Sequence, residues 1–212
     1  MDVTFFHTWI EEIAREVETH RDHLTHLDAA IGDADHGTNL ARGFTAVLAA
    51  MEADEPKTPG ALLTLVGTTL IAKVGGASGP LYGTAFRRAG KALGDAEEVT
   101  PADLGEALSA ALGGVQKLGA AAIGDKTMVD ALAPAVAAYS AAVANGSEPA
   151  EAYVAAAAAA EQGATDTIPL QARKGRASYL GPRSVGHEDP GAASTALILG
   201  ALRRVGTRGS QQ

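Results

Sequence analysis

The spacing of apolar residues is the feature that most restricts the fold of this chain. No stretch alternates apolar and polar residues with a period of two beyond a few positions, so no half-buried strand is predicted. Apolar residues recur instead at helical spacing, and Phe6, Trp9, Ile10, Ile13 and Val17 fall on one stripe of residues 2–19. Breaks rich in glycine and proline separate further helical segments. These are expected near residues 38–53, 62–74, 81–93, 101–118, 128–143, 148–163 and 190–205. The sequence therefore predicts an all-α chain of about eight helices, whose loops gather at the ends of a bundle.

Length and composition indicate a single domain over residues 1–212, with a tail that frays from about Thr207. Hydrophobic residues make up 46% of the chain, which is enough to fill a core. The absence of cysteine excludes disulfides, zinc thiolates and thiol nucleophiles. The net charge of −8 argues against a nucleic-acid partner. Since neither a signal peptide nor an apolar run of about 18 residues is present, we expect a cytoplasmic protein with no membrane association.

Three aspartates, Asp28, Asp33 and Asp35, stand within eight residues. Carboxylates this close repel one another unless a cation neutralises them. Oxygen ligands of this kind suit a hard cation such as Mg²⁺ rather than zinc. Gly32 and Gly37 flank the cluster and are expected to supply its turn freedom. The cluster therefore predicts a Mg²⁺ site with positions left open for phosphate oxygens.

The glycine-rich segment 75–80 precedes a predicted helix. Glycines let backbone N–H groups approach an anion closely, and the positive end of a helix dipole favours negative charge. The segment is neither a Walker loop nor a dinucleotide fingerprint. A tight turn between helices is the alternative, but beside the aspartate cluster we favour phosphate binding.

Residues 166–188 form a long segment without helical periodicity. Connections of this length are usually functional or disordered. Four cations, Arg173, Lys174, Arg176 and Arg183, lie here in an otherwise acidic chain. We expect a basic lid over an anion; a solvated flexible loop is the alternative.

Five segments together resemble the nucleotide-binding L subunit of dihydroxyacetone kinases. They are residues 28–39, 75–83, 124–130, 172–181 and 186–192, and they follow one another over nearly the whole chain. The resemblance implies an eight-helix antiparallel up-and-down barrel with the nucleotide site at one end.

The resemblance also implies roles for individual residues. Asp28, Asp33 and Asp35 would hold two Mg²⁺ ions that bridge the phosphates of ADP or ATP. The residues implied at the phosphates are His36, Gly37, Thr38, Asn39, Ala77 and Ser78. Those implied around the adenine are Gly119, Thr127 and Met128, and those in the lid and its closing end are Arg176, Asp189, Pro190 and Gly191. No residue is expected to act as a covalent catalyst, since phosphoryl transfer needs mainly positioning and charge neutralisation.

Partners follow from the same resemblance. Dihydroxyacetone would be held by a separate K subunit, so this chain should be inactive alone. A free L chain resembles the multi-subunit form, in which a phosphohistidine carrier, the M subunit of the phosphotransferase system, rephosphorylates bound ADP. A homodimer is also implied. The sequence leaves open whether the phosphoryl donor is this carrier or free ATP, and whether the substrate is dihydroxyacetone or a related ketose.

Two other functions stay in view. The nucleotide domain of a fatty-acid kinase shares the barrel and the aspartates, but it usually has threonine at the position of His36 and lacks the glycine-rich form of residues 75–83. A non-catalytic ADP-sensing adaptor of a transcriptional regulator would use the same surface, and the sequence does not separate it from a kinase subunit.

Overall fold

The structure is a computed structural model that describes residues 1–208. Over these residues it contains helices and connecting loops and no strand, so the prediction of an all-α fold is confirmed. The α-helices are α1 (Val3–Thr19), α2 (Arg21–Ile31), α3 (His36–Asp54), α4 (Pro59–Lys73), α5 (Ser78–Leu93), α6 (Pro101–Gly119), α7 (Met128–Ala144), α8 (Pro149–Thr165) and α9 (Pro190–Arg208). A 3₁₀ segment, η1 (Arg176–Ser184), precedes α9.

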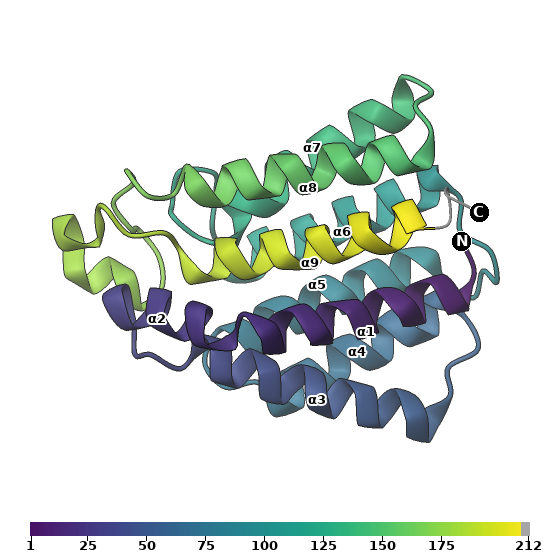
Figure 1. Ribbon diagram of the computed structural model, residues 1–212, viewed down its shortest axis with the longest axis horizontal. Helices are drawn as coiled ribbons and strands as arrows, with labels where there is room; N and C mark the ends of the chain where they lie inside the picture. The colour runs from purple at the N-terminus through teal and green to yellow at the C-terminus, as the bar shows by residue number, and fades with distance from the viewer. Residues whose placement is uncertain (209–212) are drawn as a thin grey trace.

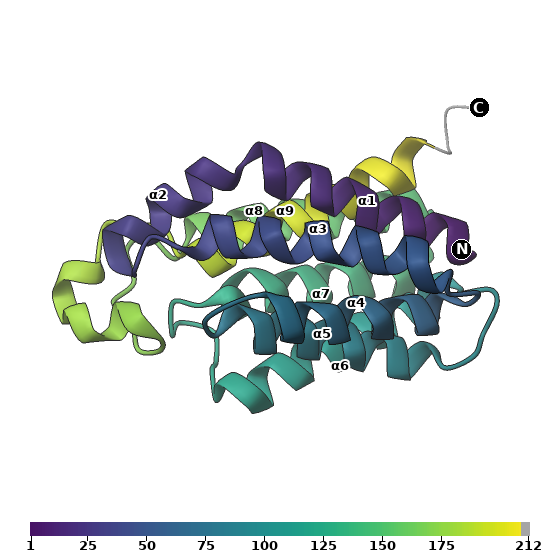
Figure 2. The same cartoon turned by 90° about the horizontal axis from the view of Figure 1, so that it is seen from below.

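The helices pack side by side in a closed circuit. Each helix from α3 to α9 packs against the next, α9 packs against α1, and α1 packs against α3. Successive helices from α3 to α9 alternate in direction along the long axis of the molecule (Figure 1). Figure 2 shows the same helices from below, with α1 and α2 following one another along one side. This circuit supports the predicted antiparallel barrel.

The two ends of the molecule differ. The α2–α3, α4–α5 and α6–α7 loops gather at one end, together with η1 and the start of α9 (Figure 1). The N-terminus and the described end of α9 lie at the opposite end (Figure 1). All the sequence segments that predicted ligand binding therefore meet at one end.

Several boundaries differ from the sequence-based expectation. Helix α2 is absent from the helices that the sequence predicts, because its apolar stripe is short and only Leu24 and Ile31 of its apolar residues are fully buried. Helix α5 begins at Ser78, three residues earlier than expected, and so includes part of the glycine-rich segment. Thr207 belongs to α9, and the rest of the tail expected to fray, residues 209–212, lies outside the described residues.

Glycine brings α4 and α5 into close contact. A Cβ added at Gly60 would lie 2.8 Å from the Gly90 carbonyl oxygen, and one at Gly90 would lie 2.6 Å from the Gly60 oxygen. Gly67 and Gly83 face one another in the same way about two turns further along. Backbone-to-backbone contact replaces bulky side chains here, which is how a chain with only 4% aromatic residues packs a dense core. None of the helices in residues 1–208 is long and apolar enough to cross a membrane.

Candidate functional site

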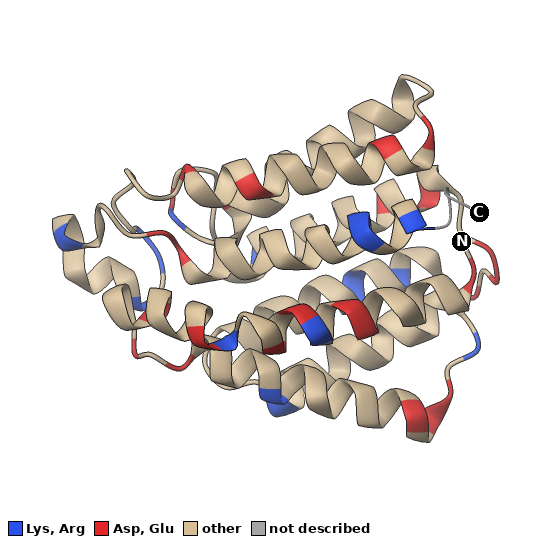
Figure 3. Cartoon of the chain, viewed as in Figure 1, with Lys and Arg blue, Asp and Glu red and all other residues tan. Residues whose placement is uncertain are grey.

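The predicted ligand-binding segments line one cavity of about 300 Å³ at the loop end of the molecule. Figure 3 shows that acidic and basic residues meet at this end. The predicted site residues that line it are Asp28, Asp33, Asp35, His36, Ala77, Ser78, Gly119, Thr127, Met128, Arg176, Asp189, Pro190 and Gly191. The sequence thus identified most of the polar wall of the cavity.

The three aspartates converge on one wall. One carboxylate oxygen from each of Asp28, Asp33 and Asp35 lies within 4.8 Å of the others. Asp28 is buried, Asp35 is half-buried and Asp33 is exposed, so the cluster opens toward the cavity rather than into the core. Carboxylate oxygens grouped in this way, with solvent access on one side, fit Mg²⁺, which keeps several non-protein ligands.

Asp28 also builds the loop that carries the other two aspartates. Its Oδ2 accepts hydrogen bonds from the backbone N–H groups of Asp35, at 2.9 Å, and His36, at 3.2 Å. These bonds fold residues 32–35 back onto the last turn of α2. The placement of Asp28 on a helix is a detail that the sequence analysis missed.

The expectation of turn freedom is wrong for Gly37, which lies in the first turn of α3, whereas Gly32 ends α2 with φ of −140° and ψ of −138°, outside the helical and extended regions. The left-handed residue of the loop is Ala34, with φ of 61°, while Gly32 and Gly37 have no positive φ. Both glycines also provide space. A Cβ at Gly32 would lie 2.0 Å from Asp28 Oδ1, and one at Gly37 would lie 2.0 Å from the backbone oxygen of Arg21 on α2.

A cation of the chain lies beside the cluster. Arg176 Nη2 is 3.1 Å from Asp33 Oδ2, and the side chains are 68% and 39% exposed, respectively. Arg176 begins η1, so the 166–188 segment already covers the aspartate wall. The stretch expected to be irregular therefore contains a turn of defined structure, with Gly175 and Gly181 at positive φ on either side of its first half.

His36 joins three of the converging elements. Its ring, which is buried, lies with Nδ1 3.0 Å from Ser78 Oγ on α5 and Nε2 2.9 Å from Ser194 Oγ on α9. Burial lowers the pKa of His36, so the imidazole is neutral at physiological pH. Tyr82 extends the network, because its hydroxyl lies 2.6 Å from Ser194 Oγ and donates to the Gly191 carbonyl. Tyr82 lies within the segment 75–83 but was assigned no role there, and Ser194 lies within a predicted helix just after the segment 186–192, so the sequence did not mark either as a site residue.

The glycine-rich segment presents the start of a helix to the cavity. The N-cap of α5 is Ala77, so no side chain caps the N–H groups of the first turn. The preceding Gly76 has φ of 67°. A Cβ at Gly79 would lie 2.3 Å from the Val74 carbonyl oxygen, so this turn requires glycine. The free N–H groups of the first turn carry partial positive charge, which suits a phosphate.

The far wall of the cavity is small and apolar. Gly119, Met128, Leu81 and Val115 line it, and a Cβ at Gly119 would lie 3.5 Å from Leu81. Asp130 shapes the loop before α7 by accepting from the backbone N–H groups of Gly124, at 2.5 Å, and Thr127, at 2.7 Å. A flat apolar wall beside polar groups is typical of a nucleotide-base site.

Asp189 closes the other side. It is buried, and burial raises its pKa to about 7, while the hydrogen bond from the backbone N–H of Ala192, at 2.8 Å, opposes that rise. Its own backbone N–H donates to Thr167 Oγ1. Asp189 thus caps α9 and fixes Pro190 and Gly191 at the cavity wall.

Three predicted phosphate-binding residues do not line the cavity. Gly37, Thr38 and Asn39 lie in the first turn of α3 behind His36. Gly37 packs against α2, and Asn39 Oδ1 accepts from Arg42 at 2.7 Å. Their contact with a phosphate stays a prediction.

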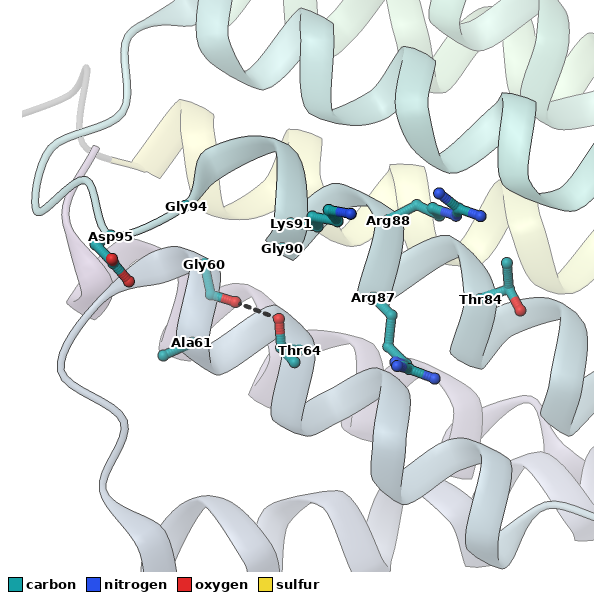
Figure 4. A pocket seen from close by; sticks show the side chains of 10 residues that line it. All are labelled: Gly60, Ala61, Thr64, Thr84, Arg87, Arg88, Gly90, Lys91, Gly94 and Asp95. Carbon is teal, nitrogen blue, oxygen red and sulfur yellow. Dashed lines mark hydrogen bonds between the residues drawn. The ribbon is translucent and has the colours of Figure 1, made fainter.

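A second hollow lies away from the aspartates, on α4 and α5. It has a volume of about 810 Å³ and contains none of the predicted site residues. Figure 4 shows Arg87 and Arg88 diverging from α5 there, with Lys91 one turn on. The stems of the two arginines lie over Gly67 and Gly114 of the neighbouring helices.

Comparison with known proteins identifies the family. The DAK2 domain model matches residues 30–204. The chain belongs to the DAK2 domain family. Its match begins near the end of α2 and ends within α9, so it includes every cavity-lining residue except Asp28.

Individual relatives are named as subunits of dihydroxyacetone kinases. The chain is 42% identical over 194 residues to the ADP-binding subunit DhaL of the PEP-dependent dihydroxyacetone kinase of Escherichia coli, covering 92% of each chain. It is 37% identical to the ADP-binding subunit DhaL of the PTS-dependent dihydroxyacetone kinase of Lactococcus lactis, covering 93% of this chain and 94% of that one. The resemblance stated from the sequence is confirmed.

Solved structures show the same fold. The dihydroxyacetone kinase of C. freundii in complex with AMP-PNP and Mg²⁺ superposes with a TM-score of 0.72 at 28% identity, over 92% of this chain. Its native form gives a TM-score of 0.74 at 27% identity, over 96% of this chain. This chain spans about a third of that kinase chain.

Proposed function

We propose that this chain, as a single domain, is the nucleotide-binding subunit of a multi-subunit dihydroxyacetone kinase. It binds ADP or ATP through Mg²⁺ in the 300 Å³ cavity and supports transfer of the γ-phosphoryl group to dihydroxyacetone held on a K subunit. The observation that carries the proposal is the convergence of Asp28, Asp33 and Asp35 on a cavity whose other walls include a helix N-terminus and an apolar face.

The aspartates hold two Mg²⁺ ions in this proposal, and the ions supply the charge neutralisation that phosphoryl transfer needs. Ser78 offers its hydroxyl and the start of α5 to the phosphates. Arg176, which lines the cavity and pairs with Asp33 at 3.1 Å, would exchange that carboxylate for a phosphate oxygen. Neutral His36 holds Ser78 in place.

The adenine occupies the apolar side of the cavity. Gly119 leaves room beside Leu81, while Thr127 and Met128 form the turn into α7. Pro190 and Gly191 close the cavity from α9. Gly37, Thr38 and Asn39 would contact the phosphates from the first turn of α3, next to His36.

The partners belong to the proposal as well. A K subunit presents the ketose, and a phosphohistidine carrier, the M subunit, rephosphorylates ADP that remains bound. Two DhaL relatives are named as parts of PEP-dependent and PTS-dependent kinases, which supports this donor over free ATP. The cavity is lined by two lysines, Lys126 and Lys174, but the ammonium of Lys126 donates to three backbone carbonyls, and no cysteine is present. The described site is thus dominated by groups suited to nucleotide, which supports a subunit that leaves ketose capture to a partner. A homodimer is proposed from the resemblance alone.

The test mixes the purified chain with a K subunit, Mg-ATP and dihydroxyacetone. We expect dihydroxyacetone phosphate only when both proteins are present, and sustained turnover only with a phosphohistidine donor. Formation of the product at an enzyme-like rate by this chain alone would contradict the proposal. Phosphorylation of a carrier-bound fatty acid instead would favour the fatty-acid kinase alternative.

A further inference from the structure

Lys126 is the one lysine or arginine of residues 1–208 whose side chain is buried, with 1% of its surface exposed. It lies in the α6–α7 loop, just before Thr127, and its φ of 62° is in the left-handed region that favours glycine. A buried charge in strained backbone is unfavourable unless it is paired or hydrogen-bonded. Nothing in the binding of Mg²⁺ or phosphate described above requires it.

The Lys126 ammonium donates to three backbone carbonyls of another segment. They are the carbonyls of Thr167, at 2.9 Å, of Leu170, at 3.1 Å, and of His187. An ammonium has three N–H donors, so all the hydrogen bonds that Lys126 can donate go to backbone oxygens. Thr167 and Leu170 precede η1 and His187 follows it, so one side chain holds both ends of the segment 167–187, which we call the lid.

Backbone hydrogen bonds close the lid at the same place. The N–H of Gly186 donates to the Ile168 carbonyl at 2.8 Å and joins the two ends. The N–H of Arg173 donates to the carbonyl of Asp125, the residue before Lys126, at 3.0 Å. The α6–α7 loop is therefore the support on which the lid rests.

The supported lid reaches the opposite side of the cavity. Arg176, in the lid, contacts Asp33, while Thr127 and Met128, directly after Lys126, line the apolar wall. The position of the arginine over the aspartates depends on where the base of the lid is held. Lys126 also lies at the cavity lining, but its ammonium is bonded to the lid, so a change there would shift the lid while the aspartates, Ser78 and Arg176 all remain.

We propose that Lys126 is a positioning residue, which fixes the lid over the cavity and couples its apolar wall to its phosphate wall. Its effect on nucleotide affinity rests on the proposed function, whereas the fastening of the lid does not. The mechanism is a change in lid order, since the ammonium contacts no part of the aspartate wall.

The test compares Lys126→Met with Lys117→Met by hydrogen exchange of the nucleotide-free protein. Methionine keeps the length and apolar stem of lysine but has no donor. Lys117 is an exposed residue of α6 that makes no hydrogen bond or ion pair within residues 1–208, so it controls for the loss of one positive charge. We expect amides of residues 167–187 to exchange at least about tenfold faster in Lys126→Met, a change equivalent to about 1.4 kcal/mol, with α4 and α5 unchanged. Lys117→Met should match the wild type.

Calorimetry with Mg-ADP supplies the second readout. We expect affinity to fall at least about tenfold in Lys126→Met and not in Lys117→Met. Unchanged lid exchange in Lys126→Met, or faster exchange spread equally over all helices, would overturn the proposal by showing no role or a merely structural one. If neither the wild type nor Lys117→Met binds Mg-ADP, the proposed function fails while the exchange data still decide the role of Lys126.

A measurement on the wild type covers the case in which Lys126→Met does not fold. An amine-reactive reagent should modify Lys117 quickly in the native nucleotide-free protein and leave Lys126 unmodified. Equal rates of modification at the two lysines would show that the ammonium is not held by the lid and would overturn the proposal.

Discussion

Replacing one metal-site aspartate should stabilise the ligand-free protein and abolish its stabilisation by Mg-ADP. The ligand oxygens of the three aspartates lie within 4.8 Å of one another, a distance at which two unit charges repel by about 0.9 kcal/mol in water and more at lower effective dielectric. Asp35→Asn removes two such repulsions, or about 2 kcal/mol at the aqueous limit. Asp35 is the N-cap of α3 but its side chain makes no capping hydrogen bond, so asparagine loses none.

Asp33→Asn should stabilise the ligand-free protein less than Asp35→Asn does. Its carboxylate pairs with Arg176 at 3.1 Å, and an exposed pair of this kind is worth about 0–1 kcal/mol, which the substitution gives up. Asp28→Asn should lose stability instead, because the charged Oδ2 accepts two backbone hydrogen bonds. The order of stability without ligand is therefore Asp35→Asn, then Asp33→Asn, then wild type, then Asp28→Asn.

The assay is thermal unfolding at low ionic strength, in EDTA and in Mg-ADP. For a chain of this size about 1 kcal/mol corresponds to roughly 2–4 °C, so Asp35→Asn should raise the midpoint in EDTA by about 4–8 °C. Mg-ADP at about 100 times its dissociation constant should add about 2.7 kcal/mol to the wild type and nothing to Asp33→Asn or Asp35→Asn. Glu106→Gln, at an exposed position of α6, is the control for loss of one negative charge. A lower midpoint for Asp35→Asn in EDTA, or a retained Mg-ADP shift, would refute the reasoning.

Three further outcomes are expected. Gly37→Ala places a Cβ 2.0 Å from the Arg21 oxygen, and should lower the free energy of unfolding by about 3 kcal/mol in urea titration, whereas Gly113→Ala, with nothing within 4 Å, should not lower it. Because burial raises the pKa of Asp189 to about 7, the folded state keeps a proton that the unfolded chain releases, so wild-type stability relative to Asp189→Asn should fall by about 1.4 kcal/mol per pH unit between about pH 4 and 7 and then level off. A difference independent of pH would contradict this. Trypsin should cut after Arg173 and Arg176 more slowly when Mg-ADP is bound, and equal cleavage with and without it would argue against a closing lid.

The helical fold could be predicted because its signal is local and repeated. Long helices such as α1 and α6 carry an apolar stripe or a proline at the first position, and their limits agree with the expectation to within two residues. The short helix α2 could not, since most of its surface faces solvent and its stability comes from packing against α3. Gly37 lies at the contact between α2 and α3. The sequence suggested a turn there because glycine occurs both in turns and where two helices pack closely, and the sequence alone does not distinguish the two roles.

The candidate site likewise has features that the sequence predicts and features that only the structure shows. Aspartates two and five residues apart are visible in the sequence, and so is the cationic lid, because each concentrates unusual residues in a short segment. The links between segments are not visible. The contacts of His36 with Ser78 and Ser194, and those of Lys126 with the lid, join residues about 40 to 160 positions apart, and only the folded chain brings them together.

The N-terminus and the described end of α9 both lie at the end of the molecule remote from the cavity (Figure 1). A domain joined at either point would project away from the site at which we propose that nucleotide and partner meet. A domain fused beyond α9 therefore keeps clear of the site, and longer relatives such as the human triokinase/FMN cyclase, of which this chain covers 32%, contain a matching segment within a larger chain. For the experimenter, an affinity tag or fluorophore attached beyond α9 would lie remote from the cavity, whereas one at the N-terminus would remove the Met1 ammonium from the Val99 carbonyl, to which it donates at 2.8 Å. A label introduced near η1 would report on the lid and also risk blocking it.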